Sequence, residues 1–567
     1  MKYKHFIIIY LSLCIGDLDA QIVFENEATS MGMDVSSGVT FLGNGLSLAD
    51  FDNDGWDDIT LTTGVGQAVR FFKNVNGNFV EQIFNLPNLD IQTKAVNWVD
   101  IDNDGDKDLF VTSDTSGNKL FENTGSLVFQ EISEISGMNT NNMFSYGASW
   151  GDYNNDSFLD VFISNRSEAV PNILYKNNGD NTFTDESGFA GISNDGHMSF
   201  CSVFFDLNND GFQDIYISND KYNHANIMYL NNGNGTFTDV SESSLTNISI
   251  DAMTTTIGDY NNDGWFDIYV TNTSNGNVLF KNQTNGTFLN TTAESGTSFN
   301  SIGWGAVFLD ADNDKDVDLY VSGYFDGSTE GLLSAAFYEN IGNETFSIPS
   351  NAGFSGDDRE SYSNATADLN HDGLVDIVVN NGDNMDVFVW NNQSVTANSW
   401  LKVSLEGVQS NRDGIGAVIE ISINNNKQYR YTHLGEGYLS QNSSTKSFGL
   451  GDATNIDYVK VTWLSGIEDV LYNVNPNQSL HITEGNTLSL NSAQINTTRL
   501  TTNPVDNLLI VKSDVPIIKL ELYSIIGQEI MSSYNKSKIN VSHLKSGYYF
   551  LQVTTNKGLS VLRFVKN

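Results

Sequence analysis

The chain has 567 residues, and its 70 Asp and Glu against 28 Lys and Arg give a formal net charge of −42 at pH 7. Phosphate backbones and anionic lipid surfaces repel such a polyanion, so this charge disfavours nucleic-acid binding. Hydrophobic residues make up 39% and aromatic residues 11%, which is typical of a chain that buries a core and not of a disordered one.

Residues 1–20 have the features of a cleavable export signal. Lys2 and Lys4 precede the apolar run of residues 6–15, which is too short to span a bilayer. A buried first helix or strand is the alternative. Cleavage after Ala20 would leave Cys201 as the single cysteine, so an exported chain without an internal disulfide needs another source of stability. No later segment is apolar enough to predict a transmembrane helix.

Seven copies of a nine-residue acidic pattern follow. They begin at Asp50, Asp100, Asp152, Asp206, Asp259, Asp310 and Asp368. The spacing of 50 to 58 residues is the length of a four-stranded unit. Alternating apolar residues precede each copy, a β-rich segment such as 215–219 follows it, and two further strands flank an Asn-Gly turn, as in residues 173–187. The repeats therefore predict an all-β fold in which residues 21–398 form a seven-bladed β-propeller.

The two ends of the repeat array indicate how the ring closes. Residues 23–33 resemble the fourth strand of an internal repeat, such as residues 182–192, yet they precede the first acidic pattern. The last repeat, in contrast, lacks a good fourth strand after residues 387–392. We therefore expect the N-terminal strand to complete the last blade, which would remove the open sheet edges.

The acidic pattern predicts a calcium loop in each blade. Oxygen-bearing side chains stand at positions 1, 3, 5 and 9, position 6 is Gly in five of seven copies, and the variable position 7 would offer its carbonyl. Calcium prefers such ligands, whereas magnesium retains more water, and no His or Cys recurs to favour zinc or copper. Up to seven ions are expected, one per blade. The predicted ligands are Asp50, Asp52, Asp54, Trp56, Asp58, Asp100, Asp102, Asp104, Asp106, Asp108, Asp152, Asn154, Asp156, Phe158, Asp160, Asp206, Asn208, Asp210, Phe212, Asp214, Asp259, Asn261, Asp263, Trp265, Asp267, Asp310, Asp312, Asp314, Asp316, Asp318, Asp368, Asn370, Asp372, Leu374 and Asp376.

The loop resembles the beginning of an EF-hand, but the flanking strands and the Asp at position 9 argue against a helix-loop-helix arrangement. Over about residues 22–395 the repeats resemble FG-GAP, or VCBS-type, repeats of the integrin α-subunit propeller. The resemblance implies calcium sites between the first two strands of each blade. We expect calcium to stiffen the propeller without a direct part in its function.

Two departures from the pattern predict unequal sites. Ser157 and Lys315 replace the Gly at position 6, so the loops that begin at Asp152 and Asp310 are expected to be strained or weaker. Asn replaces Asp at position 3 in four loops, which removes one charge from each and predicts weaker binding there than in the loops with Asp.

Residues 399–485 have another pattern, in which glycine turns separate alternating strands. The phrases NRDGIGAVIEI from Asn411, HLGEGYLSQNS from His433 and FGLGD from Phe448 predict a small β domain. They resemble the ASPIC/UnbV domain, which follows such propellers in the cartilage acidic protein family. Arg412 and Asp413 could form a ligand site, but a structural ion pair at a turn is the favoured interpretation.

Residues 486–502 are rich in Ser, Thr and Asn and predict a linker. Beyond it the charge changes sign, since residues 501–567 hold eight Lys and Arg against four acids. Residues 503–567, with LELYSIIGQEI from Leu520 and INVSHLKSGYYFLQV from Ile539, resemble the C-terminal sorting domain of the Bacteroidetes type IX secretion system. We expect an immunoglobulin-like β-sandwich, and a plain immunoglobulin-like binding module is the alternative.

The sequence contains no recognised catalytic motif such as His-Glu-x-x-His, Gly-x-Ser-x-Gly or a phosphate loop. His197 and His224 could act as acid or base, but lone histidines more often do neither. We therefore predict a non-catalytic, monomeric protein, secreted or attached to the outer surface. It would bind a glycan or protein partner as an adhesion module and engage the type IX machinery through its tail. The alternative is a polysaccharide lyase or hydrolase with its site in the propeller funnel.

Overall fold

The computed structural model describes residues 21–325, 327–486, 499–501, 504–513, 515–524, 529–555 and 558–567. The predicted export signal and residues 487–498 of the predicted linker lie outside this set. Contacts divide the chain into two compact units, residues 1–466 with 472–481 and residues 467–471 with 482–567. The fold is all-β, as predicted, with two short helices, α1 (Ser187–Ala190) and α2 (Thr292–Ser295). Neither described helix has the length and apolar character that a membrane crossing requires.

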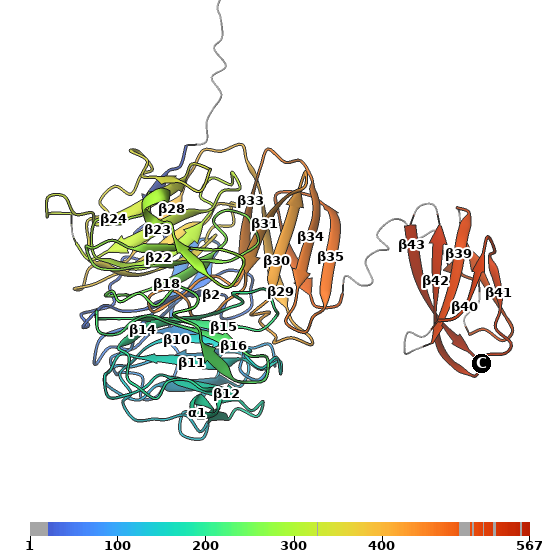
Figure 1. The fold of residues 1–567 in the computed structure, drawn as a ribbon, viewed down its shortest axis with the longest axis horizontal. Coiled ribbons are helices and arrows are strands. Elements are labelled where there is room, and N and C mark those ends of the chain that lie inside the picture. The colour runs from blue at the N-terminus through green and yellow to red at the C-terminus, as the bar shows by residue number, and fades with distance from the viewer. Residues whose placement is uncertain are drawn as a thin grey trace, which may run out of the picture. The chain divides into compact units, whose positions relative to one another are not determined.

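Seven antiparallel sheets, which we call repeat sheets 1–7, follow the seven sequence repeats (Figure 1). Repeat sheets 1 to 3 contain β2 (Leu46–Ala49), β3 (Asp58–Leu61), β4 (Arg70–Val75), β5 (Asn78–Gln82); β6 (Val96–Val99), β7 (Asp108–Val111), β8 (Lys119–Asn123), β9 (Phe129–Glu131); and β10 (Ser145–Gly151), β11 (Asp160–Asn165), β12 (Ile173–Asn177), β13 (Phe183–Asp185). Repeat sheets 4 and 5 contain β14 (Ser199–Phe205), β15 (Asp214–Asn219), β16 (Ile227–Asn231), β17 (Phe237–Asp239); and β18 (Thr255–Gly258), β19 (Asp267–Val270), β20 (Val278–Asn282), β21 (Phe288–Asn290). Repeat sheets 6 and 7 contain β22 (Gly303–Leu309), β23 (Asp318–Gly323), β24 (Ala335–Asn340), β25 (Phe346–Ser347); and β26 (Ser361–Ala367), β27 (Asp376–Asn381), β28 (Phe388–Asn392), β1 (Phe24–Asn26).

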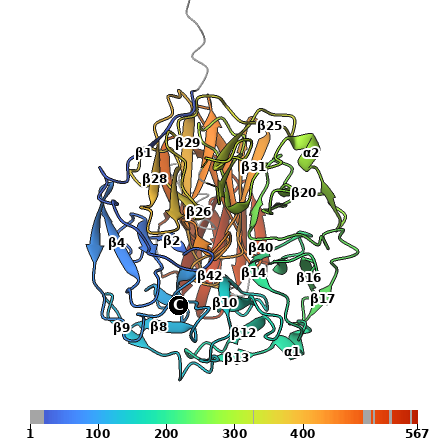
Figure 2. The same cartoon turned by 90° about the vertical axis from the view of Figure 1, so that its left-hand side faces the viewer.

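The first strand of each repeat sheet lies near the middle of the array and the later strands lie toward its periphery (Figure 2). Burial follows this order. Every residue of β14 is buried, whereas β17 buries only Phe237. An inner strand that is covered on both faces reads as a continuous apolar run, and an outer strand that is covered on one face alternates. The sequence repeat therefore encodes both the strand order and the direction of the core.

The array closes on itself through strand pairing and packing. Strand β1 pairs antiparallel with β28, with Phe24 opposite Asn392, so the N-terminal strand is the fourth strand of repeat sheet 7. Seven apolar clusters fill the spaces between neighbouring sheets, and one of them joins sheet 7 to sheet 1, with Val389 and Leu46 among its members. Each sheet thus buries both faces against its neighbours, which stabilises the array through apolar burial.

Residues 399–466 belong to the same compact unit as the repeat sheets. They form the strands β29 (Ser399–Glu406), β30 (Val418–Ile423), β31 (Asn426–Tyr431), β32 (Ser440–Gln441), β33 (Lys446–Gly451) and β34 (Ile456–Thr462), which β35 (Glu468–Val474) and β36 (Gln478–Thr483) follow. Strand β30 lies between β31 and β34, and β29 pairs with β33. The short strand β32 pairs in parallel with β2 and becomes a fifth strand of repeat sheet 1.

The second unit contains two sheets that share one apolar core. The first consists of β37 (Arg499–Leu500), β38 (Leu508–Lys512) and β41 (Lys538–Asn540), and the second consists of β39 (Ile517–Ser524), β40 (Glu529–Tyr534), β42 (Gly547–Thr555) and β43 (Gly558–Lys566). Leu509 and Ile539 from the first sheet and Leu520, Leu551 and Phe564 from the second are buried together. The predicted C-terminal β domain is therefore a two-sheet structure.

Candidate metal-binding loops and the segment that covers them

Each acidic pattern forms the loop between the first two strands of its repeat sheet, and we number these Asp loops 1–7. In Asp loop 1, Asp50 Oδ1 accepts a hydrogen bond from the N–H of Asp54 (2.9 Å) and Oδ2 accepts one from the N–H of Gly55 (2.7 Å). The same pair of bonds recurs in the other six loops. The Asp at position 1 therefore folds the loop around its own carboxylate.

The Asp at position 9 begins the second strand and is buried. Asp58 Oδ2 accepts the N–H of Phe51 (3.1 Å), and Oδ1 accepts the N–H of Asn74 on the third strand (2.7 Å). The bond from the third-strand Asn recurs in all seven sheets. This carboxylate thus connects the second and third strands to the beginning of the loop and keeps one edge of the loop in place.

Position 6 needs a left-handed backbone conformation in every loop. Gly55 has φ 92°, and the two residues that replace glycine adopt the same region, Ser157 with φ 75° and Lys315 with φ 92°. A side chain in this region costs about 1–2 kcal/mol. Asp loops 3 and 6 therefore carry the backbone strain that the sequence predicts.

Two repeated asparagines, which the sequence analysis left unused, link the loops into a ring. The Asn at position 4 donates its amide to the position 6 carbonyl of the next loop, as from Asn53 to Gly105 (2.9 Å), and this bond recurs at six junctions. At the seventh junction His371 replaces Asn and stacks on Trp56 of Asp loop 1, with ring centroids 3.7 Å apart. The recurrence of Asn at position 4 in six of the seven loops was the signal for this role.

The third-strand Asn supplies a second link. The Asn177 amide donates to the Ile101 carbonyl of Asp loop 2 (2.8 Å), and equivalent bonds join five other junctions. One of them, from Asn74 to the Leu369 carbonyl (2.9 Å), joins sheet 1 to Asp loop 7. Because buried amides and carbonyls need partners, these bonds set the spacing of the seven loops.

The carboxylates converge most closely in three loops. One oxygen from each of three Asp side chains lies within 4.8 Å of the others in Asp loops 1, 2 and 6, in the groups Asp50, Asp52, Asp58; Asp100, Asp102, Asp108; and Asp310, Asp312, Asp314. These are the loops with Asp at position 3. Among the described residues, the four loops with Asn at position 3 form no such group.

These carboxylates have the character of cation ligands. Burial raises the pKa of Asp58 and of Asp108 to about 8, because an uncompensated charge is poorly solvated there. The buried Asp52 Oδ1 has no hydrogen-bond partner. A divalent cation would compensate the charge and bind the free oxygen, so the donor set fits a hard ion such as calcium.

Residues 399–466, which we call the covering segment, cover the face on which the Asp loops lie. Lys402 Nζ lies 2.6 Å from Asp368 Oδ2 of Asp loop 7, and both side chains are buried. At Asp loop 2, Asp413 Oδ2 accepts the N–H of Asp100 (3.1 Å) and the carboxylate pairs with Lys107, while the N–H of Arg412 donates to Asn103 Oδ1 (2.8 Å). Arg412 and Asp413 thus anchor this segment on the loops.

Residues 432–445, which we call the central loop, contact the first strand of every repeat sheet. The Leu439 carbonyl accepts the N–H of Leu46 (3.2 Å), and the Leu434 carbonyl accepts that of Trp150 (2.9 Å). Four further hydrogen bonds reach repeat sheets 2, 4, 5 and 7: Trp98 N to Gln441 Oε1, Cys201 Sγ to Gly437 O, Gly437 N to Thr255 O and Thr366 N to Asn442 Oδ1. Repeat sheet 6 contacts the loop through Trp304, whose ring centroid lies 4.7 Å from that of Tyr438. The central loop therefore fills the middle of the array, and Cys201 is a free, buried thiol beneath it.

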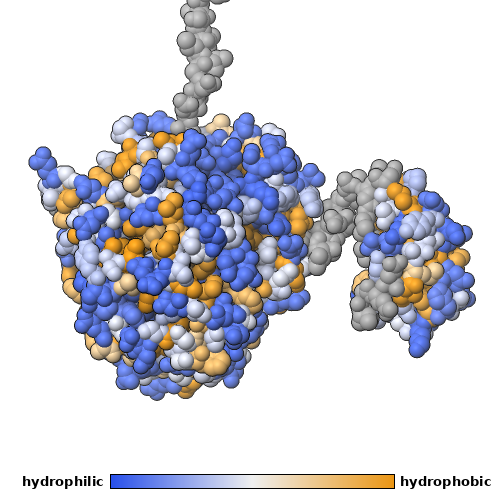
Figure 3. Space-filling model, in the orientation of Figure 1, coloured by the Kyte–Doolittle hydropathy of each residue, from blue (hydrophilic) through white to orange (hydrophobic). Residues whose placement is uncertain are grey.

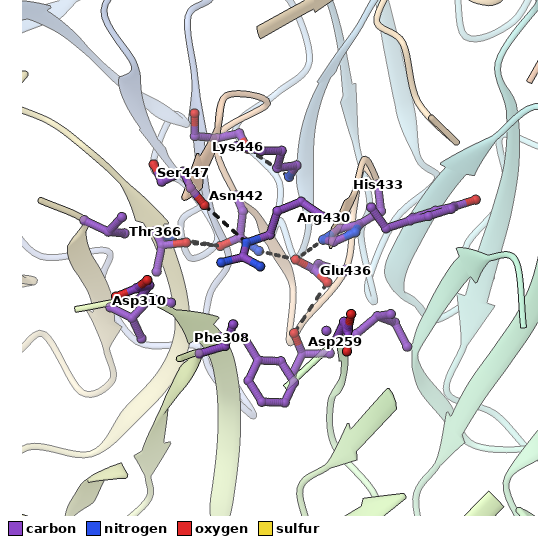
Figure 4. A pocket seen from close by; sticks show the side chains of 18 of the residues that line it. Asp259, Phe308, Asp310, Thr366, Arg430, His433, Glu436, Asn442, Lys446 and Ser447 are labelled. Atoms are coloured by element: carbon purple, nitrogen blue, oxygen red, sulfur yellow. Dashed lines mark hydrogen bonds and ion pairs between the residues drawn. The ribbon is translucent and has the colours of Figure 1, made fainter. Parts of the chain in front are cut away.

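A charged cavity of about 100 Å³ lies beside the central loop, between β31 and repeat sheets 5 to 7 (Figure 4). Glu436 points toward His433 and Asn442 in its wall. Arg430 lies between the carboxylates of Asp259 and Asp310, and burial lowers the pKa of its guanidinium. A second, larger cavity of about 690 Å³ lies between Asp loops 1, 2 and 7 and the covering segment.

The two histidines considered as acid or base lie near each other on loops outside these cavities. Their ring centroids are 6.2 Å apart. His197 Nε2 lies 3.1 Å from Ser193 Oγ, and burial lowers the pKa of the His197 imidazole. His224 Nε2 lies 3.6 Å from Glu168 Oε1. His197 therefore has a partner on its own loop, and His224 has one on the loop between β11 and β12.

Comparison with protein families identifies three parts of the chain. FG-GAP-like repeats match residues 50–111, 100–163, 152–217, 206–270 and 259–321. ASPIC and UnbV matches residues 407–489, and a secretion system C-terminal sorting domain matches residues 502–567. All three resemblances drawn from the sequence are confirmed, and the sorting domain marks the chain as an exported protein.

Among curated proteins, cartilage acidic protein 1 of Xenopus tropicalis is 22% identical over 495 residues, which cover 77% of this chain and 73% of the relative. Cartilage acidic protein 1 of Homo sapiens is 29% identical over 187 residues, which cover 31% of this chain and 28% of the relative.

Two solved structures of B. thetaiotaomicron are also similar. The extracellular domain described as that of a hybrid two-component system is 10% identical with a TM-score of 0.39, and the alignment covers 96% of this chain and 72% of that chain. The extracellular domain of a one-component system is 11% identical with a TM-score of 0.37, and covers 97% and 60%. At these TM-scores the likeness carries no argument about the fold or function.

Proposed function

We propose that this chain, which carries FG-GAP-like repeats, an ASPIC and UnbV domain and a secretion sorting tail, is a calcium-stabilised β-propeller protein that binds an extracellular partner without catalysis. The observation that carries the proposal is the ring of seven linked Asp loops, each with buried carboxylates that need a counter-ion. The seven repeat sheets would be seven blades around one axis. The second unit would be an immunoglobulin-like sandwich, since its two antiparallel sheets share one core.

Calcium would bind to side-chain oxygens at positions 1, 3, 5 and 9 and to the carbonyl at position 7 of each loop. The bound ion would supply positive charge where burial now opposes ionisation of the Asp side chains. The chain's own contribution is the geometry, because the backbone bonds to positions 1 and 9 hold the carboxylates in place before the ion arrives. Calcium would thus replace the disulfides that an exported chain with one buried thiol lacks.

The filled centre supports a binder rather than an enzyme. Propeller blades surround a central channel, and here the central loop occupies that position and contacts all seven first strands, which disfavours the alternative of an enzyme site in the funnel. On the face of the first unit that Figure 3 shows, hydrophilic residues predominate and hydrophobic ones lie in small separate patches. Such a surface suits a glycan or a protein partner that is recognised mainly through polar contacts. It also suits a monomer, and the tail of that monomer would engage the type IX machinery.

The calcium assignment is tested by thermal melting with excess calcium and after chelation, together with metal counting by mass spectrometry. We expect chelation to lower the melting temperature and purified protein to contain several calcium ions per chain. Magnesium at the same concentration serves as the control and should restore little of the loss. An unchanged melting temperature and no bound calcium would overturn the assignment.

The binding role is tested on a glycan array and with a panel of soluble polysaccharides. We expect saturable binding without release of sugars. Arg412→Ala changes a side chain of the covering segment and leaves the sequence of the repeat sheets unchanged. Its binding, compared with that of the unchanged chain, measures what the covering segment contributes. Metal-dependent, saturable release of sugars would instead establish a polysaccharide lyase or hydrolase.

A further inference from the structure

Asp loop 7 differs from the other six because a lysine from outside the repeats reaches its position 1 carboxylate. Lys402 Nζ lies 2.6 Å from Asp368 Oδ2, and the two side chains are only 7% and 2% exposed. The same oxygen accepts the N–H of Gly373 (2.9 Å). Among the described residues, Asp368 is the single position 1 Asp with a Lys or Arg nitrogen within 4.0 Å.

The covering segment fixes this lysine in place. Trp400, two residues before Lys402 on β29, packs against Asp loop 7 so closely that a Cβ on Gly373 would lie 2.0 Å from its Nε1. The Lys402 ammonium lies 5.2 Å from the Trp400 ring, and the N–H of Trp400 donates to Asn477 Oδ1 (3.0 Å). Strand β29 also pairs with β33 at this point, with Lys402 opposite Ser447. The strand therefore holds the backbone of Lys402 next to the Asp368 carboxylate.

Lys73 at Asp loop 1 provides an instructive contrast. It contacts Asp52 and Asp54, but the side chains of Lys73 and Asp54 are 30% and 34% exposed. An exposed lysine can swing into water when an ion arrives, since solvent screens and solvates it. Lys402 is instead buried beside the cavity between Asp loops 1, 2 and 7 and the covering segment, and is only 7% exposed to solvent.

We propose that Lys402 is a built-in cation that replaces calcium in Asp loop 7, so that the chain holds calcium in at most six of its seven loops. This inference rests on the proposed calcium binding. An ion 2.3 to 2.6 Å from the Asp368 carboxylate would lie within about 5 Å of the buried Lys402 ammonium, and burial leaves that repulsion weakly screened. Asn370 at position 3 removes a further negative charge. We expect affinity at Asp loop 7 at least about 100-fold below that of a loop without the lysine.

Asp loop 4 is the matched reference. Its ligand positions have the same composition, with Asp206, Asn208, Asp210 and Asp214, and its glycine is also retained. Neither loop forms a group of three converging carboxylates. The two loops have the same ligand side chains, and only Asp loop 7 has a lysine at its position 1 carboxylate, so substitutions of an exposed ligand in the two loops can be compared.

The test counts calcium per full-length chain at saturation, by mass spectrometry of protein separated from free ion. Asp210→Asn in Asp loop 4 should lower the count by one, whereas Asp372→Asn in Asp loop 7 should leave it unchanged. Lys402→Met should raise the count by one, and adding Asp372→Asn to it should remove that gain. Asp372 and Asp210 are exposed, so these two variants test the inference even where Lys402→Met fails to fold.

Terbium luminescence gives an independent readout, because Trp400 next to Asp loop 7 would sensitise an ion bound there. We expect the signal excited through tryptophan to increase in Lys402→Met and not to change in Asp372→Asn. A loss of one calcium on Asp372→Asn in the otherwise unchanged chain would overturn the inference while leaving calcium binding intact. A wild-type chain without any calcium would overturn the proposed function itself.

Discussion

At the scale of single residues, the third-strand asparagines bind neighbouring loops to one another, a role that a search for metal ligands overlooks. Asn177 is buried, its amide nitrogen donates to the carbonyls of Ile101 (2.8 Å) and Leu159 (3.2 Å), and its oxygen accepts the N–H of Gly179 (2.9 Å). We predict that Asn177→Ala lowers the free energy of unfolding by about 3 kcal/mol, because it leaves buried backbone groups without partners. Urea unfolding in calcium measures the change.

The neighbouring Asn178 is the control for this prediction. It is exposed and bonds only within its own hairpin, to Thr182 and Thr184. Asn178→Ala should cost less than about 1 kcal/mol. Equal losses from the two variants would mean that the link between sheets contributes nothing beyond the local turn.

A second prediction at this scale concerns pH. Asp357 Oδ2 accepts the Tyr320 hydroxyl (2.9 Å), its Oδ1 is buried without a partner, and burial raises the pKa of the carboxyl from 3.8 to about 7. The folded state therefore holds a proton that the unfolded state releases, so the stability from this group is complete below about pH 4 and decreases up to about pH 7. Relative to Asp357→Asn, the wild type should lose up to about 1.4 kcal/mol per pH unit in that window.

Unfolding in excess calcium at several pH values measures this difference. A constant difference between wild type and Asp357→Asn across the window would contradict the raised pKa.

The residue pattern predicted the ligand positions but not their unequal surroundings. Alternating Asp and Asn at fixed spacing is enough to predict a cation loop, because the spacing itself decides which side chains face inward. Lys402 lies 34 residues from Asp368, and nothing in its local sequence marks it as a neighbour. Such contacts depend on how a distant strand lies over the loop.

At the scale of elements, the central loop contacts the first strands of all seven repeat sheets. Tyr438 is fully buried, and its ring centroid lies 4.7 Å from that of Trp304 and 5.5 Å from that of Phe200. Its hydroxyl donates a hydrogen bond to the Leu42 carbonyl (2.7 Å). Tyr438→Ala should cost about 3–5 kcal/mol through the cavity that it creates, and Tyr438→Phe about 1 kcal/mol through the lost hydrogen bond. Thermal melting or urea unfolding measures both.

Tyr472→Ala is the matched surface control, since that side chain is 61% exposed. It should change stability by less than about 0.5 kcal/mol. If Tyr438→Ala were as mild as the control, the central loop would only rest on the array without stabilising it.

The elements differed in how well sequence could predict them. Strands β14 and β15 follow directly from apolar runs and from the repeat, and the N-terminal strand could be assigned to repeat sheet 7 because it matches a fourth strand of other repeats. The segment HLGEGYLSQNS reads only as a glycine-rich turn, and its position depends on seven sheets that are distant in sequence. Local patterns encode strands, whereas a loop that fills a shared centre is encoded by all of its neighbours.

At the scale of the whole molecule, the net charge of −42 is concentrated where an ion can offset it. The Asp loops place 24 of the 70 acidic residues at predicted ligand positions. Six calcium ions would bring the formal charge to −30, and Lys402 would compensate the seventh loop without an ion. Self-repulsion destabilises a compact polyanion, so removal of calcium should make stability more dependent on salt.

The division into units predicts the outcome of truncation. The covering segment and the central loop belong to the same compact unit as the repeat sheets. A chain that ends at Asn398 would expose the aromatic cluster around Trp304 and leave the buried Asp368 without its lysine. We predict that this chain fails to unfold cooperatively even in calcium, whereas one that ends at Asn486 retains the main melting transition of the full chain and loses only that of the tail. Calorimetry of the three chains distinguishes the outcomes, and a chain ending at Asn398 that melts like the full-length protein would show that the repeat sheets form a complete domain without the central loop.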